Sequence, residues 1–198
     1  MAANVPRPIL VKGGKMSPSS TAPNRPMADV ADHEMQWVQP KLLKRHYDLL
    51  AGADLIAALD FRRGTLADAA SQSESWTFKR EGFWHPRVTV RALGSETNRA
   101  LFGPHWGGGG ELRTKDGRTY TLKVASFWHS EWQWQEQDRI LVNFKRPAGL
   151  LKSDCVVDVP PDGRRLPDLA LLVTLGWYLM VLYAQDMAIV TAAGAAAR

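Results

Sequence analysis

The side chains that could bind a metal ion are three histidines, each next to a tryptophan: His85, His105 and His129. They lie 20 and 24 residues apart, without an HxH or HExxH pattern that would bring two imidazoles together. We therefore expect separate surface or interface histidines; a metal site assembled from distant strands is the alternative. The single cysteine, Cys155, excludes a cysteine-based zinc site and an internal disulfide. Because valines follow it, we expect a buried, unreactive thiol.

Two further segments could bind an anion or a cation. The segment GPHWGGGGE (residues 103–111) is rich in glycine but lacks the GK[ST] ending of a phosphate-binding loop and leads into a strand, so we predict a flexible turn. Asp158, Asp162 and Asp168 lack the alternating calcium-loop pattern, so we predict a turn and a helix cap. No nucleophile, base and acid form a recognisable set. We expect neither an enzyme nor a bound cofactor.

Paired basic residues are the candidates for contact with an anionic surface. The pairs are Arg62-Arg63, Lys79-Arg80 and Lys145-Arg146. A Lys or Arg near an anionic membrane contributes about 1 kcal/mol, so at least two pairs must reach the same rim to matter. The chain carries a net charge of +5, but its basic and acidic residues are interleaved. We therefore expect no specific nucleic-acid binding, and name anionic lipid or a protein complex as the partner.

A tryptophan-rich segment, SFWHSEWQWQEQ, has the alternation of a half-buried strand. Alternation places Trp128, Trp132 and Trp134 on one face, opposite polar neighbours. We predict that this aromatic face packs against a central helix. An exposed aromatic patch at a lipid or protein interface is the alternative.

The elements that would position these residues are mostly short strands. From Trp37 onward, about twelve segments of strand composition alternate with Gly, Asp, Pro and Ser. Residues 47–61 read as two strands around a glycine turn, and Asp116-Gly117 supplies the positive-φ pair of a two-residue hairpin turn. AGLLK (residues 148–152) is a further candidate. This pattern predicts an all-β barrel or sandwich.

The most apolar segment, LPDLALLVTLGWYLMVLYAQD (residues 166–186), is either a membrane span or a buried helix. Its uncharged part, residues 169–184, would extend only about 24 Å as a helix. A span needs roughly 30 Å, although the mild residues that follow could lengthen it. A helix that is apolar on every side must otherwise be enclosed by protein, and a barrel of short strands can enclose it.

We predict a central helix at about residues 167–188, with Pro167 in its first turn and Asp168 near the positive end of its dipole. Gly176 is expected where a strand backbone passes close to the helix. The predicted helix core is Leu172, Gly176, Trp177 and Leu179.

Residues 1–35 differ from the rest of the chain. They are rich in Pro, Ser, Ala and Gly and lack hydrophobic periodicity. We predict a flexible or partner-bound N-terminal arm that can dock on a partner, followed by one domain at residues 36–198. The apolar run in the arm is too short for a secretory signal, so we expect a cytoplasmic protein, peripheral at the membrane.

The order of about twelve strands followed by the helix DLALLVTLGWYLMVLYAQD resembles the tubby C-terminal-like superfamily, which includes tubby domains, phospholipid scramblases and plant LURP-one-related proteins. The resemblance covers about residues 37–188. It implies a closed barrel threaded by the helix, and binding to membrane phosphoinositides or other lipids. No site residue can be carried over from these families.

Two function classes follow. The first is a non-enzymatic binding module that acts at a membrane surface or on a protein partner. The second is an accessory or structural subunit of a membrane protein complex, with the C-terminal helix inserted in the bilayer.

Overall fold

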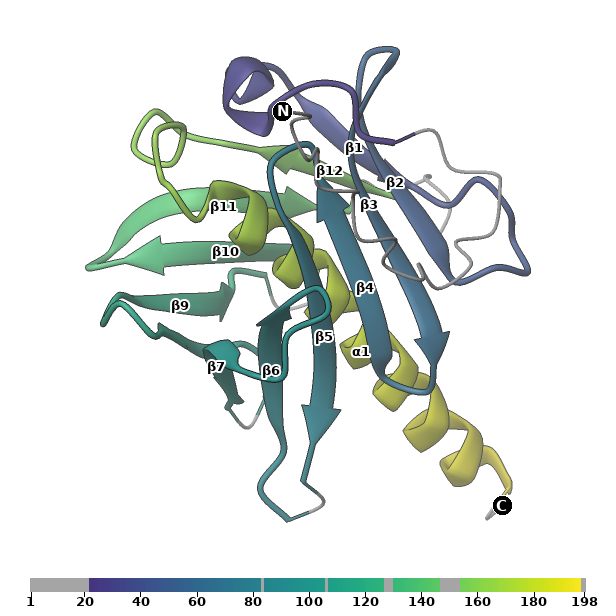
Figure 1. Cartoon of the computed structure of the whole chain (residues 1–198). Coiled ribbons are helices and arrows are strands. Elements are labelled where there is room, and N and C mark those ends of the chain that lie inside the picture. Colours follow the sequence, from purple (N-terminus) through teal and green to yellow (C-terminus); the bar gives the residue numbers. More distant parts are fainter. Residues whose placement is uncertain (1–21, 83, 106, 127–129, 147–153, 197–198) are drawn as a thin grey trace, which may run out of the picture.

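A computed structural model describes residues 22–82, 84–105, 107–126, 130–146 and 154–196. Over this part of the chain, a closed barrel of twelve antiparallel strands surrounds one C-terminal helix, which confirms the predicted fold class (Figure 1). The elements are η1 (Met27–Val30), β1 (Met35–Val38), β2 (His46–Ala51), β3 (Asp54–Arg63), β4 (Leu66–Ser71), β5 (Ser75–Glu81), β6 (Arg87–Ala92), β7 (Asn98–Pro104), β8 (Gly110–Thr114), β9 (Thr119–Val124), β10 (Glu131–Glu136), β11 (Arg139–Lys145), β12 (Cys155–Asp158) and α1 (Leu169–Ala196).

Each strand pairs with its neighbours in sequence, and β1 pairs with β12 to close the barrel. In such an up-and-down barrel all odd-numbered strands run in one direction, so the connections that follow them meet at one end. Because α1 follows β12, it begins at the opposite end and runs toward these connections (Figure 1). We call the end where α1 begins the proximal end, and the end where it leaves the barrel the distal end.

The helix has no polar face, and its residues from Leu169 to Leu182 are buried apart from the half-buried Ala170. Aromatic rings fill the space between helix and wall: Trp177 stacks on Trp37 with ring centroids 6.0 Å apart, and Tyr178 stacks on Phe61 at 5.4 Å. By length and composition alone, Leu169–Gly194 could cross a membrane, but 72% of its most apolar window is buried. The segment is therefore the core of the barrel.

The strand predictions hold better than the turn predictions. Residues 47–61 do form two strands around Gly52, and residues 110–124 form the β8–β9 hairpin. At Asp116-Gly117, however, only Gly117 has a positive φ, and Thr114 pairs with Arg118 around a three-residue turn. The expected two-residue turn was wrong because a third residue takes part. AGLLK lies outside the described residues.

The start of α1 is fixed by Asp168, one residue before the helix. Its carbonyl accepts from the Leu172 amide at 2.9 Å, as at a helix N-cap, which confirms the predicted cap. Its buried carboxylate accepts from the Tyr120 hydroxyl at 2.9 Å and lies 2.7 Å from Arg118. Burial, followed by the bond to Asp168, raises the pKa of Tyr120 to about 12, so the hydroxyl keeps its proton. The helix begins at residue 169, two residues after its predicted start, and ends at residue 196, eight residues after its predicted end.

Gly176 has close neighbours, but these are side chains and not the expected strand backbone. A Cβ placed there would lie 2.4 Å from Phe144 Cζ of β11 and 2.8 Å from Trp134 Nε1 of β10. The rest of the predicted helix core, Leu172, Trp177 and Leu179, is buried.

The predicted arm of residues 1–35 is only partly separate from the domain. Residues 1–21 lie outside the described part of the chain. Met27 and Val30 of η1 are buried in the core cluster, η1 lies against α1, and the buried Met35 already belongs to β1. The low apolar content of residues 1–35 gave no sign of this contact, because only two apolar side chains, Met27 and Val30, are needed to form it.

Candidate functional site

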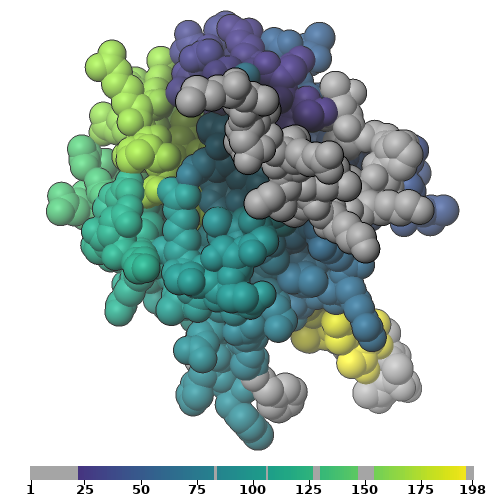
Figure 2. Space-filling model, viewed as in Figure 1, coloured from purple at the N-terminus to yellow at the C-terminus, as the bar shows by residue number. Residues whose placement is uncertain are grey.

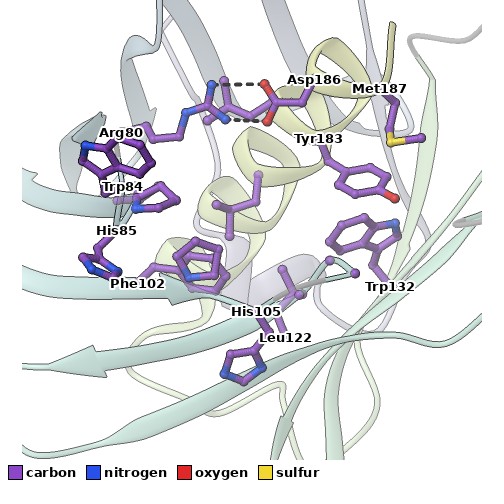
Figure 3. A pocket seen from close by; sticks show the side chains of 18 residues that line it. Arg80, Trp84, His85, Phe102, His105, Leu122, Trp132, Tyr183, Asp186 and Met187 are labelled. Carbon is purple, nitrogen blue, oxygen red and sulfur yellow. Dashed lines mark hydrogen bonds and ion pairs between the residues drawn. The ribbon is translucent and has the colours of Figure 1, made fainter. Parts of the chain in front are cut away.

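A cavity of about 750 Å³ lies at the distal end, between α1 and the wall formed by β5 to β10. Figure 3 shows the side chains around its open centre, with Tyr183 of the helix facing Trp132 of β10. These two rings meet edge to face, with centroids 5.2 Å apart. Most of the lining is apolar and comes from both helix and wall, including Val88, Phe102, Leu122, Trp132, Leu179 and Leu182. The space can therefore hold an apolar ligand of ordinary size.

The polar lining groups include one ion pair between wall and helix. Arg80 of β5 donates two hydrogen bonds to the Asp186 carboxylate of α1, from Nη1 to Oδ2 at 2.5 Å and from Nη2 to Oδ1 at 3.1 Å (Figure 3). The hydrogen bond to Asp186 raises the pKa of Arg80, against the effect of burial. The exposed imidazoles of His85 and His105 lie on the same cavity. The spacing of these histidines in the sequence did not predict that His85 and His105 line the same cavity. His129 lies outside the described residues.

The glycine run of residues 107–110 makes room for the cavity. Gly108 has φ +101°, and a Cβ there would lie 3.5 Å from the rings of both Trp132 and Tyr183. Gly109 has φ +75° and would clash with the Leu122 carbonyl oxygen at 2.3 Å. Within the segment predicted as a flexible turn, residues 103–104 belong to β7 and residues 110–111 to β8, and the described glycines between them bring backbone close to aromatic side chains.

The predicted aromatic face points inward. Trp132 and Trp134 are buried, and the Trp134 indole donates to the Leu172 carbonyl at 2.8 Å. The prediction that these rings pack against the central helix is confirmed for both; Trp128 lies outside the described residues.

All three basic pairs lie at the distal end, because β3, β5 and β11 are odd-numbered strands that end there. A β-bulge near the end of β3 leaves both Arg62 and Arg63 exposed. The other two pairs divide, because successive strand residues face opposite sides of the wall.

In each divided pair, one side chain faces solvent and the other faces the helix. Lys79 and Lys145 are exposed and pair with Glu81 at 3.2 Å and Glu131 at 3.7 Å. Arg80 reaches Asp186. Of the three predicted pairs, Arg62, Arg63, Lys79 and Lys145 therefore lie at the distal surface, where Arg62 forms an ion pair with Asp68.

Arg146 is the inward member of the third pair. Its guanidinium carbon lies 5.4 Å from the centre of the Trp177 ring, and burial lowers its pKa. Burial also raises the pKa of Cys155 to about 12, which agrees with the expected unreactive thiol. Arg146 therefore belongs to the packing of the core.

Basic residues are in excess at one end of the described barrel, and acidic residues are in excess at the other. In the loops and the three adjoining strand positions of the distal end, the basic residues are Lys41, Lys44, Arg45, Arg62, Arg63, Lys79, Arg80, Arg87, Lys123, Lys145 and Arg146. The acidic residues there are Asp48, Asp68, Glu81, Glu111, Glu131 and Asp154, with Asp186 of α1. At the proximal end, acidic residues outnumber basic ones. The distal end is therefore the cationic end.

Most of the strongly exposed large apolar side chains of the described residues also lie at the distal end. They are Leu42 and Leu43 in the β1–β2 loop, Trp84 in the β5–β6 hairpin, and Met187, Ile189 and Val190 on α1. Sequence reasoning missed the segment Lys41-Leu42-Leu43-Lys44, whose signal is an apolar pair flanked by lysines outside any strand. Figure 2 shows the hairpin and the end of α1 projecting from the same end of the barrel.

The carboxylates considered for calcium do not converge. Asp158 and Asp162 lie at the proximal end with Asp168, whose carboxylate is held by Arg118 and Tyr120. Across the described residues, no group of three or more His, Cys, Asp or Glu side chains could hold a metal ion.

No protein-family model, curated protein or solved structure matches this chain.

Proposed function

We propose that this protein is a non-enzymatic binding module that docks on an anionic membrane surface through the distal end of its barrel. The observation that carries this proposal is the gathering of cationic and exposed apolar side chains on the same end. Either feature alone is common on protein surfaces.

The cationic part of the distal end supplies attraction at a distance. Arg62, Arg63, Lys79 and Lys145 are exposed on strands that end together. Each would contribute about 1 kcal/mol near an anionic leaflet, screened over a Debye length of about 10 Å at 0.1 M salt. Nearby carboxylates reduce this attraction, so we expect shallow, salt-sensitive binding.

The apolar part supplies short-range contact with the interface. Leu42 and Leu43 are 76% and 101% exposed, Trp84 is 84% exposed, and Ile189 is 68% exposed. Tryptophan and leucine beside lysine are suited to the boundary between headgroups and acyl chains. These side chains would enter that boundary while the barrel stays outside it.

The alternative, an accessory subunit with α1 inserted in the bilayer, fits the contacts less well. Withdrawing α1 would break the bonds of Leu172 to Trp134 and of Asp186 to Arg80, and would empty the barrel. The helix beyond Asp186, which we call the overhang (residues 187–196), is about 15 Å long. That is half of the roughly 30 Å of a hydrocarbon core, so the overhang can enter a leaflet but cannot span the bilayer.

Membership in the tubby C-terminal-like superfamily is part of this proposal, since a barrel around a central helix is the architecture that the resemblance implies. We further propose a cytoplasmic location, because anionic lipid is concentrated in the leaflet facing the cytoplasm.

The test is co-sedimentation with phosphatidylcholine vesicles that contain or lack phosphatidylserine, at 50 mM and 500 mM salt. The distal variant changes Arg62, Arg63, Lys79 and Lys145 to Gln. The control variant changes a set of equal charge at the proximal end to Gln, namely Arg113, Lys115, Arg139 and Arg165, all exposed.

We expect the wild-type and control proteins to bind anionic vesicles at low salt, and the distal variant to lose at least tenfold in affinity. Equal loss in both variants would show that only net charge matters. Absence of binding to both vesicle types at low salt would overturn the proposal in favour of a protein partner.

A further inference from the structure

The cavity at the distal end leaves open space between α1 and the wall of the barrel. On the other side of α1, stacked rings such as Trp37 on Trp177 occupy the space between helix and wall. Around the cavity, Gly107, Gly108 and Gly109 line the wall without side chains, and a Cβ at Gly108 would lie 3.5 Å from the Trp132 and Tyr183 rings. Apolar walls without partner atoms lose dispersion contacts, so a ligand that restores them would bind favourably.

The composition of the walls selects an apolar ligand. Val88, Phe102, Leu122 and Leu182 are each no more than 3% exposed and come from three strands and the helix. The volume of about 750 Å³ lies in the range of small-molecule sites. A hydrocarbon chain suits such walls, because burying each methylene contributes about 0.8 kcal/mol.

The polar lining groups select the other end of the ligand. Asp186, the carboxylate among the described lining residues, is already neutralised by Arg80. The remaining titratable groups of this lining are the Tyr183 phenol and the exposed imidazoles of His85 and His105, all of which can donate hydrogen bonds. The distal surface around them is cationic, so it favours an anionic head group over a cationic one.

We propose that this cavity binds the acyl chain of an anionic amphiphile, with the head group at the imidazoles and the chain between α1 and the wall. The inference goes beyond surface docking, since docking needs only the exposed rim and the overhang. The chain could belong to a free fatty acid or to a membrane phospholipid, and the two sources can be separated experimentally.

Binding of a free chain is measured with cis-parinaric acid below its micellar concentration and without vesicles. Competition with oleate and with oleyl alcohol compares an anionic head with a neutral one on the same chain. A phospholipid source is tested by transfer of a pyrene-labelled anionic phospholipid from vesicles to the protein.

The blocking variants are Val88→Phe in the wall and Leu182→Phe in the helix, which place a ring in the cavity from opposite sides. The control is Leu101→Phe, on the outer face of the strand that contributes Phe102. Thermal unfolding of each variant identifies any that fails to fold. If one blocking variant fails to fold, the other one tests whether the cavity binds the chain.

We expect saturable binding of one parinaric acid per wild-type protein, unchanged in Leu101→Phe and weakened at least tenfold in a folded blocking variant. Oleate should compete better than oleyl alcohol. If the protein takes up pyrene-labelled phospholipid and the blocking variants abolish this transfer, the bound chain belongs to a phospholipid. If the protein binds parinaric acid but takes up no pyrene-labelled phospholipid, the bound chain belongs to a free fatty acid. The inference would be overturned if the protein showed no saturable binding of parinaric acid and no lipid transfer that the blocking variants abolish. It would also be overturned if folded blocking variants bound parinaric acid as well as the wild-type protein.

The distal variant of the vesicle test should still bind parinaric acid saturably, with a smaller loss of affinity than the blocking variants, because its four changed residues do not line the cavity. Loss of vesicle docking and loss of chain binding are therefore separate results.

Discussion

At the scale of single residues, the barrel depends on close contacts between aromatic side chains and the helix backbone. Trp134 bonds to the Leu172 carbonyl, and with Phe144 it occupies the space beside Gly176. Glycine costs about 1 kcal/mol relative to alanine in a helix interior. Here that cost is offset by two large side chains that could not otherwise approach the helix.

The same substitution at two glycines of α1 should have opposite effects. Gly176→Ala should lower the free energy of unfolding by about 1 to 3 kcal/mol, because the added methyl meets Phe144 and Trp134. Gly194→Ala meets nothing within 4 Å and should be neutral or slightly stabilising. Urea unfolding of both variants measures the difference. Equal stability of the two variants would contradict the packing described for Gly176.

Two buried tryptophans differ in their hydrogen bonds and allow a second matched comparison. Trp134 and Trp76 are both fully buried, but the Trp76 indole nitrogen has no partner among the described residues. Trp134→Phe removes a hydrogen bond to α1, whereas Trp76→Phe removes an unsatisfied donor. We expect Trp134→Phe to be less stable than Trp76→Phe by about 1 kcal/mol in urea unfolding. The reverse order would mean that the bond to Leu172 adds no stability.

At the scale of elements, sequence patterns predicted most of the strands and the helix, but not β7. Alternation with turn residues predicts two strands at residues 47–61, where β2 and β3 lie, and an all-round apolar segment predicts α1. Both signals are local and periodic. The two-residue turn predicted at Asp116-Gly117 was wrong, and the contact of η1 with the core was not predicted, because each depends on partners that periodicity does not reveal.

The contact of η1 with the core can be tested with a pair of valines. Val30 of η1 is 2% exposed, whereas Val190 in the overhang is 65% exposed. Val30→Ala should lower the free energy of unfolding by about 1 to 2 kcal/mol through lost burial. Val190→Ala should change it by less than about 0.5 kcal/mol. If Val30→Ala leaves the melting temperature of the protein unchanged, η1 belongs to a separate arm after all.

At the scale of the whole molecule, topology decides which residues meet. The basic pairs are 17 and 66 positions apart in sequence, counted from Arg62 to Lys79 and from Lys79 to Lys145, yet they share the distal end because their strands run the same way. The cavity was not predicted, since its walls come from helix, strands and a glycine turn that no common pattern connects. Residues that come together only when the barrel closes share no local sequence pattern that would predict their contact.

The overhang provides a prediction at this scale. A chain that ends at Asp186 keeps the ion pair to Arg80 and all the buried part of α1, so its fold should remain intact. It loses the exposed apolar side chains of Met187, Ile189 and Val190, whose contact with a membrane is not screened by salt.

We therefore expect the truncated and full-length proteins to bind anionic vesicles at 50 mM salt through the same basic residues. At 500 mM salt, only the full-length protein should retain measurable binding, because its overhang still enters the interface. Circular dichroism and thermal unfolding check that truncation preserves the barrel. Equal retention of both proteins on vesicles at high salt would place the salt-resistant contact elsewhere on the distal end, and Leu42→Ser with Leu43→Ser would then test the β1–β2 loop.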